Sequence, residues 1–250
     1  MASNLDLKHF LPDPALWAFF FDLDGTLAPL AERPDLARVP EATIRQLTDL
    51  QRAAAGALAV ISGRPLDTLD TLLHPLVLPV GAEHGAVVRH VGGRIDPASN
   101  VAPLVQALAA HVAQGLQHEP GVLLESKDFG LAVHYRLAPA AEGAVKRLME
   151  SAVSLFPQFE LLPGKMVVEA KLPGVNKGHA LWRLMQEPPF SGRRPLMVGD
   201  DTTDEAAFLQ ANALGGSSIK IGSGDTSAAL RLGEQALLSS WLGALLQRTG

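Results

Sequence analysis

An apolar run that ends in two closely spaced carboxylates constrains the fold of this chain more than any other feature. Residues 19–27 read FFFDLDGTL, so three phenylalanines precede Asp22 and Asp24. Because side chains alternate along an extended strand, these two acids point to the same side, and Gly25 lets the chain turn sharply after them. The segment predicts a buried strand that delivers two acids to a loop where a cation could bind. The same pair could also brace a turn or cap a helix, so the rest of the chain must decide.

Size and composition limit the classes of protein to consider. The chain has 250 residues, of which 47% are hydrophobic, and this suffices for one large or two modest domains with packed cores. Its net charge of −5, with scattered Lys and Arg, argues against binding to nucleic acid or to an anionic membrane. There is no Cys, so a bound metal would be a hard cation held by oxygen or imidazole ligands.

No secretory signal is apparent in the N-terminal residues. They include Asp6 and Asp13 and lack the basic start and apolar stretch of a secretory signal. No apolar run is long enough to span a bilayer. We therefore expect a cytoplasmic protein with no membrane partner, and a monomer is favoured.

Two parts of the chain alternate short apolar segments with amphipathic ones, which is typical of an α/β fold with a parallel sheet. In the first part we expect strands from Trp17 to Leu23 and over 57–61, 77–80 and 87–91, and helices over 40–55 and 65–73. In the second part we expect helices over 176–186 and 204–213 and strands over 195–198 and 218–221. The two parts are expected to form one interrupted domain, residues 1–99 with 174–250.

The intervening residues 100–173 follow a different order. We expect helices over 101–116 and 140–156, and strands over 121–125, 131–137, 159–162 and 166–171. Runs of strand candidates beside helices predict a smaller α+β domain that is inserted into the first. Turn-forming residues at 97–100 and 172–174 are the expected hinges.

Three further motifs lie beside predicted strand ends or helix starts. In AVISGR, residues 59–64, Ser62 and nearby amides could bind phosphoryl oxygens, or Ser62 could cap the next helix through Pro65. In NKG, Lys177 stands at a helix start, where the helix dipole disfavours a cation. An anionic partner near Lys177 would explain this position, although a surface lysine is the simpler alternative.

The last motif, GDDTTDE, follows the strand predicted over 195–198 and contains Asp200, Asp201 and Asp204. Asp204 and Glu205 could also be favourable charges in the first turn of a helix. In open α/β sheets, ligand sites gather where strands end. We therefore expect the four motifs to form one site.

The motifs DLDGTL, ISGR, NKG and GDDTTDE occur in the order typical of the haloacid dehalogenase-like phosphatase superfamily, which the chain resembles over nearly its whole length. Shorter matches in GAEHG, ESK, HYR, PGK and VE, within residues 81–169, are similar to the trehalose-6-phosphate phosphatases of that superfamily. The resemblance implies a Rossmann-like core with a parallel sheet and an inserted cap domain. It also implies Mg²⁺-dependent hydrolysis of a small-molecule substrate, trehalose 6-phosphate, to trehalose and inorganic phosphate.

The resemblance further implies roles for individual residues. Asp22 would be the nucleophile that forms an aspartyl phosphate, and Asp24 the general acid and then the general base. Ser62 and Lys177 would bind the transferring phosphoryl group. Mg²⁺ would be held by the Asp22 carboxylate, the Asp24 main-chain carbonyl and Asp200, with Asp201 and Asp204 as auxiliary groups. Substrate contacts are expected at Asp22, Asp24, Gly25, Thr26, Ser62, Gly63, Arg64, Glu83, His84, Lys127, His134, Arg136, Lys165, Glu169 and Lys177.

Several alternatives stay open, because the core motifs recognise only the phosphate and adjacent atoms. Sucrose phosphate or another sugar phosphate could be the substrate, and the cap residues could be solvated surface charges. A sugar phosphomutase would use the same acids but return the phosphoryl group to the sugar. A catalytically silent sugar-phosphate sensor is a third alternative, against which the intact Asp22, Asp24, Lys177 and Asp200 argue.

Overall fold

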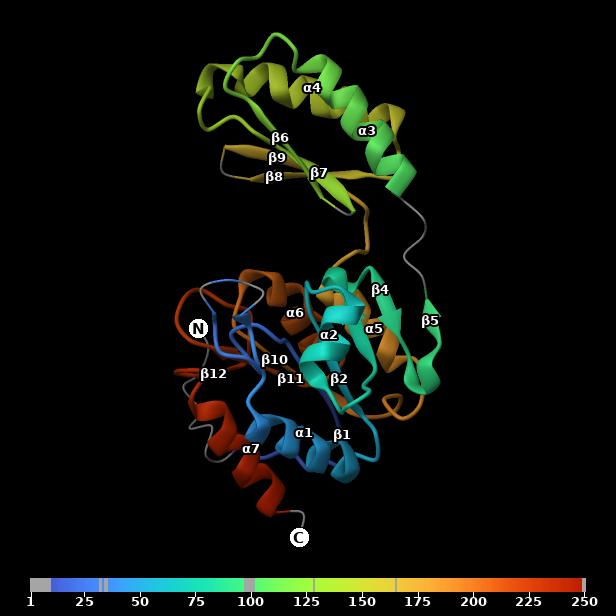
Figure 1. The fold of residues 1–250 in the computed structure, drawn as a ribbon, viewed down its shortest axis with the longest axis vertical. Coiled ribbons are helices and arrows are strands. Elements are labelled where there is room, and N and C mark those ends of the chain that lie inside the picture. The colour runs from blue at the N-terminus through green and yellow to red at the C-terminus, as the bar shows by residue number, and fades with distance from the viewer. Residues whose placement is uncertain are drawn as a thin grey trace. The chain divides into compact units, whose positions relative to one another are not determined.

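The computed structural model of the protein describes residues 10–31, 33, 36–96, 102–127, 129–164 and 166–248. These residues separate into two compact units, one within Met1–Pro97 and Asn176–Gly250, the other within Ala98–Val175 (Figure 1). We call them the core unit and the inserted unit. Each unit has a buried apolar cluster of its own.

The core unit is built on a sheet that has eight strands in the described part of the chain, in the order β12-β11-β10-β1-β2-β3-β4-β5. All neighbours from β12 to β3 are parallel, whereas β4 and β5 are antiparallel. The chain moves outward from β1 through β2 and β3, and later returns beside β1 as β10. Ligands bind at the carboxyl ends of strands where the order reverses in this way. The bounds are Trp17–Phe21 (β1), Leu58–Ile61 (β2), Val80–Ala82 (β3), Val87–Arg89 (β4), Ile95–Asp96 (β5), Arg194–Gly199 (β10), Ser217–Ile221 (β11) and Leu230–Leu232 (β12).

Helices pack on this sheet and bury its central strands. The three phenylalanines of β1 are fully buried, as expected of a parallel strand covered on both faces. Helix α1 packs against α7, and α5 packs against α6 (Figure 1). The bounds are Glu41–Ala53 (α1), Leu66–Leu73 (α2), Lys177–Met185 (α5), Glu205–Ala213 (α6) and Leu237–Gln247 (α7).

The inserted unit is an antiparallel sheet with two helices on one face (Figure 1). Its strand order in the described residues is β6-β7-β9-β8. Buried residues of β7 and β9 pack with residues of α3 and α4 in the second apolar cluster. The bounds are Ala102–Gly115 (α3), Leu123–Lys127 (β6), Gly130–His134 (β7), Glu142–Leu155 (α4), Glu160–Gly164 (β8) and Val167–Lys171 (β9).

The predicted α/β class with a mostly parallel sheet is confirmed, and some predicted bounds are wrong. The strand expected over 77–80 is instead Val80–Ala82, because Pro79 has no N–H to donate to the ladder with β2. The strand expected over 131–137 ends at His134, where a turn begins that is closed by a bond from the Ala138 N–H to the Tyr135 carbonyl at 3.0 Å. Strands β5 and β12 and helix α7 are additional elements.

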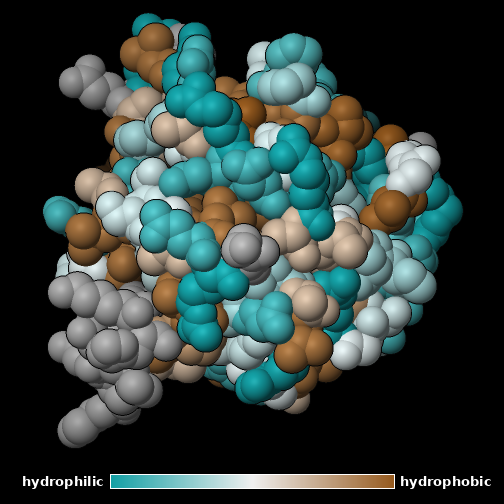
Figure 2. All heavy atoms as spheres, turned by 90° about the horizontal axis from the view of Figure 1, so that it is seen from below, coloured by the Kyte–Doolittle hydropathy of each residue, from teal (hydrophilic) through white to brown (hydrophobic). Residues whose placement is uncertain are grey.

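Figure 2 shows one face of the molecule, on which hydrophobic residues are interspersed with hydrophilic ones. Within the described residues, no helix has the length and apolar character needed to cross a membrane.

Candidate active site

Three neighbouring parallel strands of the core unit are each followed by a polar residue at their carboxyl ends. Asp22 follows β1, Ser62 follows β2 and Asp200 follows β10, and β1 lies between the other two strands. The Asp22 N–H donates to the Val198 carbonyl at 2.9 Å, and the Ser62 N–H donates to the Gly81 carbonyl at 2.8 Å. The ladder therefore continues past the strand ends and holds these loops in register.

Lys177, the first residue of α5, joins two acids. Its ammonium donates to Oδ1 of Asp22 and to Oδ1 of Asp204, both at 2.7 Å, and its side chain is 3% exposed. Asn176 caps the helix by accepting the His179 N–H at 2.9 Å. The predicted anionic partner of Lys177 is confirmed, and two carboxylates explain a cation at this end of the helix dipole.

Asp204 organises the loop that carries Asp200. Its Oδ2 accepts the N–H groups of Asp200 and Asp201, both at 3.0 Å, while its Oδ1 accepts from Lys177. The Asp201 side chain accepts the Asp204 N–H in return, which completes a capping box. Asp204 is fully buried and Asp201 is exposed. Oδ2 of Asp204 thus holds the loop in place, and Oδ1 connects it to Lys177.

Gly25 allows Asp200 to approach the first motif closely. Its φ is +77°, and a Cβ atom at this position would lie 2.0 Å from Oδ2 of Asp200. Any other residue would be strained and would collide with the carboxylate. The glycine therefore lets the two acidic loops meet.

Burial and mutual repulsion shift the pKa values of the cluster. Burial, opposed by the attraction of Lys177 and reinforced by repulsion from Asp204, raises the pKa of Asp22 to about 7. Burial, followed by repulsion from Asp204 and Asp201, also raises the pKa of Asp200. Burial alone would lower the pKa of Lys177, but the carboxylates of Asp22 and Asp204 outweigh it and the pKa is raised. The cluster therefore holds excess negative charge that a cation would relieve.

The acidic cluster fits a divalent cation. Asp22, Asp200 and Asp204 each offer a carboxylate oxygen, and these oxygens lie within 4.8 Å of one another. Oδ1 of Asp200 is buried and has no hydrogen-bond partner among the residues that the structure describes. A buried carboxylate oxygen without a donor is costly, and a bound cation would satisfy it. The all-oxygen donor set suits a hard cation.

The second motif places an arginine beside Asp24. Arg64 donates through Nε to Oδ2 of Asp24 at 2.8 Å and through Nη2 to Oδ1 at 2.6 Å. The hydrogen bond to Asp24 is the main cause of a raised pKa for Arg64. Ser62 accepts the Arg64 N–H at 3.2 Å, and the N-cap of α2 is Pro65, with no side-chain cap. The alternative in which Ser62 caps that helix is therefore wrong.

The segment after β3 folds back over the second motif. The N–H of Glu83 donates to the Arg64 carbonyl at 3.0 Å, and the N–H of His84 donates to the Ser62 carbonyl at 2.9 Å. Glu83 and His84 have φ values of 52° and 57°. A Cβ on Gly63 would lie 2.5 Å from Nε2 of His84, so the imidazole packs directly on this glycine. Backbone strain of about 1–3 kcal/mol per residue is typical of functional sites.

A cavity of about 710 Å³ in the core unit joins these groups. Its lining contains residues of all four motifs: Asp22, Asp24, Leu30, Ala31, Arg33, Ser62, Gly63, Arg64, Pro65, His84, Lys177, Asp200, Asp201 and Thr203. Gly25, Thr26 and Glu83, which were also predicted to contact substrate, are not part of this lining. Thr26 is fully buried, and its carbonyl accepts from Gln235 at 2.9 Å, so it supports the loop from behind.

The inserted unit has one apolar and one polar face. Leu131 and Val133 of β7 are buried in the cluster with α3 and α4. Residues that alternate with them therefore point to the opposite face of the sheet, as do their partners on neighbouring strands.

Three of the predicted sugar contacts lie on this polar face. Lys127 donates to Glu169 at 3.2 Å, and His134 contacts Glu125 at 2.9 Å. These four side chains are between 34% and 54% exposed and remain accessible to a ligand. Arg136 is exposed in the turn after β7, and Lys165 lies outside the described residues.

Lys220 is a residue near the site that the motifs do not include. It lies in β11, is buried, and its ammonium donates to the main-chain carbonyl of Asp200. This places a second cation next to the acidic loop. The available signal was a lysine between Ile219 and Ile221 in a predicted strand, because buried lysines are rare unless paired.

Comparisons with known sequences identify relatives over most of the chain. The family model described as trehalose-phosphatase matches residues 20–235. A trehalose-6-phosphate phosphatase from Escherichia coli (strain K12) is 42% identical over 232 residues, which cover 91% of this chain and 86% of the relative. A probable trehalose-phosphate phosphatase from Sinorhizobium fredii (strain NBRC 101917 / NGR234) is 42% identical over 207 residues, covering 82% and 78%.

Solved structures share the same architecture. A trehalose-6-phosphate phosphatase of Aspergillus fumigatus aligns with a TM-score of 0.85 at 25% identity, over 99% of this chain and all of the other. A haloacid dehalogenase-like hydrolase from B. subtilis aligns with a TM-score of 0.56 at 14% identity, over 90% and 98% of the two chains. This second likeness bears on the fold, which is that of the haloacid dehalogenase-like hydrolases.

Proposed function

The chain belongs to the trehalose-phosphatase family, and from this premise we infer that it hydrolyses trehalose 6-phosphate to trehalose and inorganic phosphate. The family model covers 216 residues, from 20 to 235, and two relatives named as phosphatases of this ester are each 42% identical. The family predicted from the motifs is confirmed. The protein is accordingly a phosphoric monoester hydrolase of trehalose biosynthesis.

The observation that carries the chemistry is the buried carboxylate of Asp22, which Lys177 contacts at 2.7 Å and which shares a cavity with Asp200. Phosphate monoesters resist hydrolysis because the dianion repels nucleophiles and the alkoxide leaves poorly. A nucleophile therefore needs cations beside it and a proton for the leaving oxygen. These residues support a mechanism with two displacements at phosphorus.

In the first displacement, a carboxylate oxygen of Asp22 bonds to phosphorus while the bond from phosphorus to the sugar oxygen breaks. Asp24 gives its proton to that oxygen, and trehalose leaves. In the second, water attacks the phosphorus, Asp24 takes a proton from the water, and the bond to Asp22 breaks. Inorganic phosphate leaves and both acids return to their starting states. Lys177 and Ser62 bind the phosphoryl oxygens throughout.

We assign the cation to the acidic cluster and propose that it is Mg²⁺. Asp22 and Asp200 would hold it through their side chains, because Asp204 already accepts from Lys177 at Oδ1 and from the Asp200 and Asp201 N–H groups at Oδ2. The Asp24 main-chain carbonyl would be the third protein ligand, and the exposed Asp201 and the buried Asp204 would be auxiliary. When bound, Mg²⁺ would neutralise charge on the phosphoryl oxygens and keep Asp22 ionised despite its burial.

We propose that sugar recognition depends on residues beyond the phosphate site. Trehalose has many hydroxyl groups, and the polar face of the inserted sheet offers Lys127, His134 and Glu169 as donors and acceptors. Arg136, Lys165, Glu83 and His84 complete the proposed set. Nucleic acid is not an expected partner of this acidic chain.

Phosphate release from purified protein tests the proposed function. Trehalose 6-phosphate, sucrose 6-phosphate and glucose 6-phosphate are compared with Mg²⁺ and with a chelator, and Asp22→Asn serves as the inactive control. We expect Mg²⁺-dependent release from trehalose 6-phosphate alone. Release from another ester would overturn the substrate but keep the chemistry. An isomerised sugar phosphate without free phosphate would point to a mutase.

A further inference from the structure

Arg64 and Asp24 form a bidentate ion pair that the proposed mechanism does not explain. Arg64 reaches both oxygens of Asp24, at 2.8 and 2.6 Å. The Arg64 side chain is 17% exposed and that of Asp24 is 34% exposed, and both line the cavity. The pair therefore lies where an entering ester meets the acid, and it is protected enough from solvent to have a defined geometry.

Hydrogen bonds hold the backbone of Arg64 in place and so orient its side chain. Its N–H donates to Oγ of Ser62 at 3.2 Å, and its carbonyl accepts the Glu83 N–H at 3.0 Å. Ser62 is itself tied to the Gly81 carbonyl at 2.8 Å. The guanidinium is thus carried by a loop that is fixed to the next strand and to the strained segment after it.

Lys177 and Arg64 serve different acids. Lys177 contacts Asp22 and Asp204, so the cation beside the nucleophile is a lysine, whose ammonium acts as a point charge. Arg64 contacts Asp24, and its planar fork matches a carboxylate in two places. A bidentate fork fixes the plane of the carboxyl group, and each oxygen keeps a lone pair outside the contact with Arg64. One of these lone pairs carries the proton that Asp24 transfers to the leaving oxygen.

We propose that Arg64 is a positioning residue that fixes the orientation of the Asp24 carboxylate for proton transfer to the leaving oxygen. This differs from the direct substrate contact predicted for Arg64 from the sequence. It rests on the proposed function, in which Asp24 serves as acid and base. In the first displacement, Arg64 should then matter only as much as the leaving group needs a proton.

Esters with different leaving groups test whether the effect of Arg64 depends on the need to protonate the leaving oxygen. A sugar alkoxide leaves poorly without a proton, whereas p-nitrophenolate leaves readily as the anion. Formation of the aspartyl phosphate should therefore depend on Arg64 for trehalose 6-phosphate and hardly at all for p-nitrophenyl phosphate. A residue that binds the phosphoryl group would affect both esters alike.

The experiment measures the first turnover of Arg64→Ala and Arg64→Lys in the Mg²⁺-loaded protein by rapid quench, as release of trehalose or of p-nitrophenolate. We expect Arg64→Ala to slow trehalose release by about 30- to 100-fold, at or below the low end of the roughly 100- to 10,000-fold that general acid catalysis contributes, because Asp24 itself is kept. Nitrophenolate release should slow less than about threefold, and KM for both esters should stay nearly constant. Arg64→Lys should resemble Arg64→Ala, because a point charge does not fix the carboxylate plane.

Two further measurements separate positioning from a loss of structure. Millimolar guanidinium ion should restore part of the trehalose release of Arg64→Ala and none of that of Arg64→Lys, whose side chain fills the space. Arg45→Ala, which removes an exposed arginine paired with Glu41 at 3.4 Å, is the matched control and should behave as wild type. Thermal unfolding of each variant shows whether the fold is kept.

Equal losses on both esters, raised KM values for both, or no loss on either would overturn the proposal. If the proposed function is wrong, the result differs, because the wild-type protein itself would then not release trehalose. In that case the same comparison is made between phenyl phosphate and p-nitrophenyl phosphate, which also differ in their need for a proton. A selective loss on phenyl phosphate would support the role of Arg64 without the sugar substrate, and an equal loss would overturn it.

Discussion

Lys177 is the residue on which both the stability and the chemistry of the acidic cluster depend. Its removal leaves Asp22 and Asp204 buried without their shared cation, and breaking a buried ion pair in this way typically costs about 3–5 kcal/mol. We expect Lys177→Gln to lower the thermal midpoint of unfolding clearly and to lower kcat for trehalose 6-phosphate by more than about 100-fold. Calorimetry and phosphate release measure the two effects.

Asp22→Asn separates the loss of turnover from the loss of stability, because it removes the nucleophile together with one of the buried charges. This variant should lose turnover while unfolding at a higher temperature than Lys177→Gln. Lys146→Gln, which breaks an exposed ion pair with Glu142, is the matched control and should change neither quantity. A Lys177→Gln protein as stable as wild type would contradict the account of the cluster.

For individual residues, the sequence predicted which side chains lie together in the site but not which atoms form hydrogen bonds. Asp22 and Asp200 could be predicted because they follow apolar strands, and Lys177 because a lysine at a helix start needs an anion. The engagement of both Asp204 oxygens and the fork of Arg64 on Asp24 depend on side-chain conformations that no spacing encodes. Lys220 was missed because it belongs to no motif.

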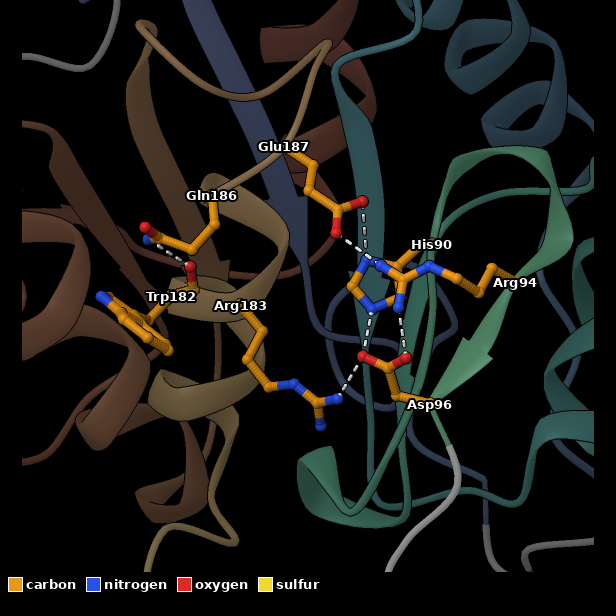
Figure 3. A network of polar contacts seen from close by, with 7 residues as sticks. All are labelled: His90, Arg94, Asp96, Trp182, Arg183, Gln186 and Glu187. Carbon is orange, nitrogen blue, oxygen red and sulfur yellow. Dashed lines mark hydrogen bonds and ion pairs between the residues drawn. The ribbon is translucent and has the colours of Figure 1, made fainter.

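A polar network ties β5 to the end of α5 in the core unit (Figure 3). Asp96 of β5 contacts His90 at 2.8 Å and also accepts from Arg94 and Arg183. Glu187 accepts from Arg94 and lies 3.4 Å from Nδ1 of His90. The network fastens the last strand before the inserted unit to the helix that begins with Lys177.

Acid should weaken this network. Burial would raise the pKa of Asp96, but hydrogen bonds from His90 and Arg183 outweigh it, so the pKa lies below its usual value. A carboxyl group with a lowered folded-state pKa contributes stability above its unfolded-state pKa of about 3.9 and loses it as the pH falls through the folded-state pKa. Asp96→Asn should therefore lower the thermal midpoint at pH 7, and its difference from wild type should shrink toward pH 3.

Melting curves across this pH range test the expectation. Asp49→Asn, which removes an exposed partner of Arg52, is the matched control and should differ little from wild type at either end. A constant difference between Asp96→Asn and wild type at every pH would mean that the carboxylate charge of Asp96 contributes nothing.

The polar face of the inserted sheet can be tested for sugar recognition at Glu169. If Glu169 contacts sugar hydroxyls, Glu169→Ala should raise KM or lower kcat for trehalose 6-phosphate by at least about tenfold, the cost of one or two hydrogen bonds to a charged group. Turnover of p-nitrophenyl phosphate should be unchanged. Glu150→Ala, on the exposed side of α4, is the control. Equal losses on both esters would count against sugar recognition by this face.

Most elements with a strong apolar pattern were predicted well, and short ones were not. The run before Asp22 and the segment ALAVI gave β1 and β2 because buried parallel strands are continuously apolar. Helix α7 buries Leu238, Trp241, Leu242 and Leu245, which follow the helical spacing i, i+3, i+4 and i+7, so its signal was present and the prediction omitted it. Strand β12 has only three residues and shows no period. Position in a sheet, which the sequence does not encode locally, decides such cases.

In the residues that the structure describes, the whole molecule has two buried apolar clusters and one cluster of acids that could hold a cation. Both apolar clusters are large enough to unfold cooperatively, whereas Asp22, Asp200 and Asp204 all belong to the core unit. Calorimetry should therefore resolve two transitions, or one asymmetric transition that fits two components. Because a ligand stabilises only the unit that binds it, the two components can be assigned by adding the cation.

Mg²⁺ should shift the component of the core unit alone. At a concentration 100 times its Kd, a ligand stabilises the folded state by about 2.7 kcal/mol, which corresponds to roughly 5–10 °C for a unit of this size. A chelator should reverse the shift, and Asp200→Asn should abolish it while leaving the other component in place. An equal shift of both components would mean that the units unfold together, and a shift that persists in Asp200→Asn would place the cation away from the acidic cluster. The acidic cluster is thus expected to couple catalysis to the stability of one unit only, because its ligands come from strand ends that the core sheet alone holds together.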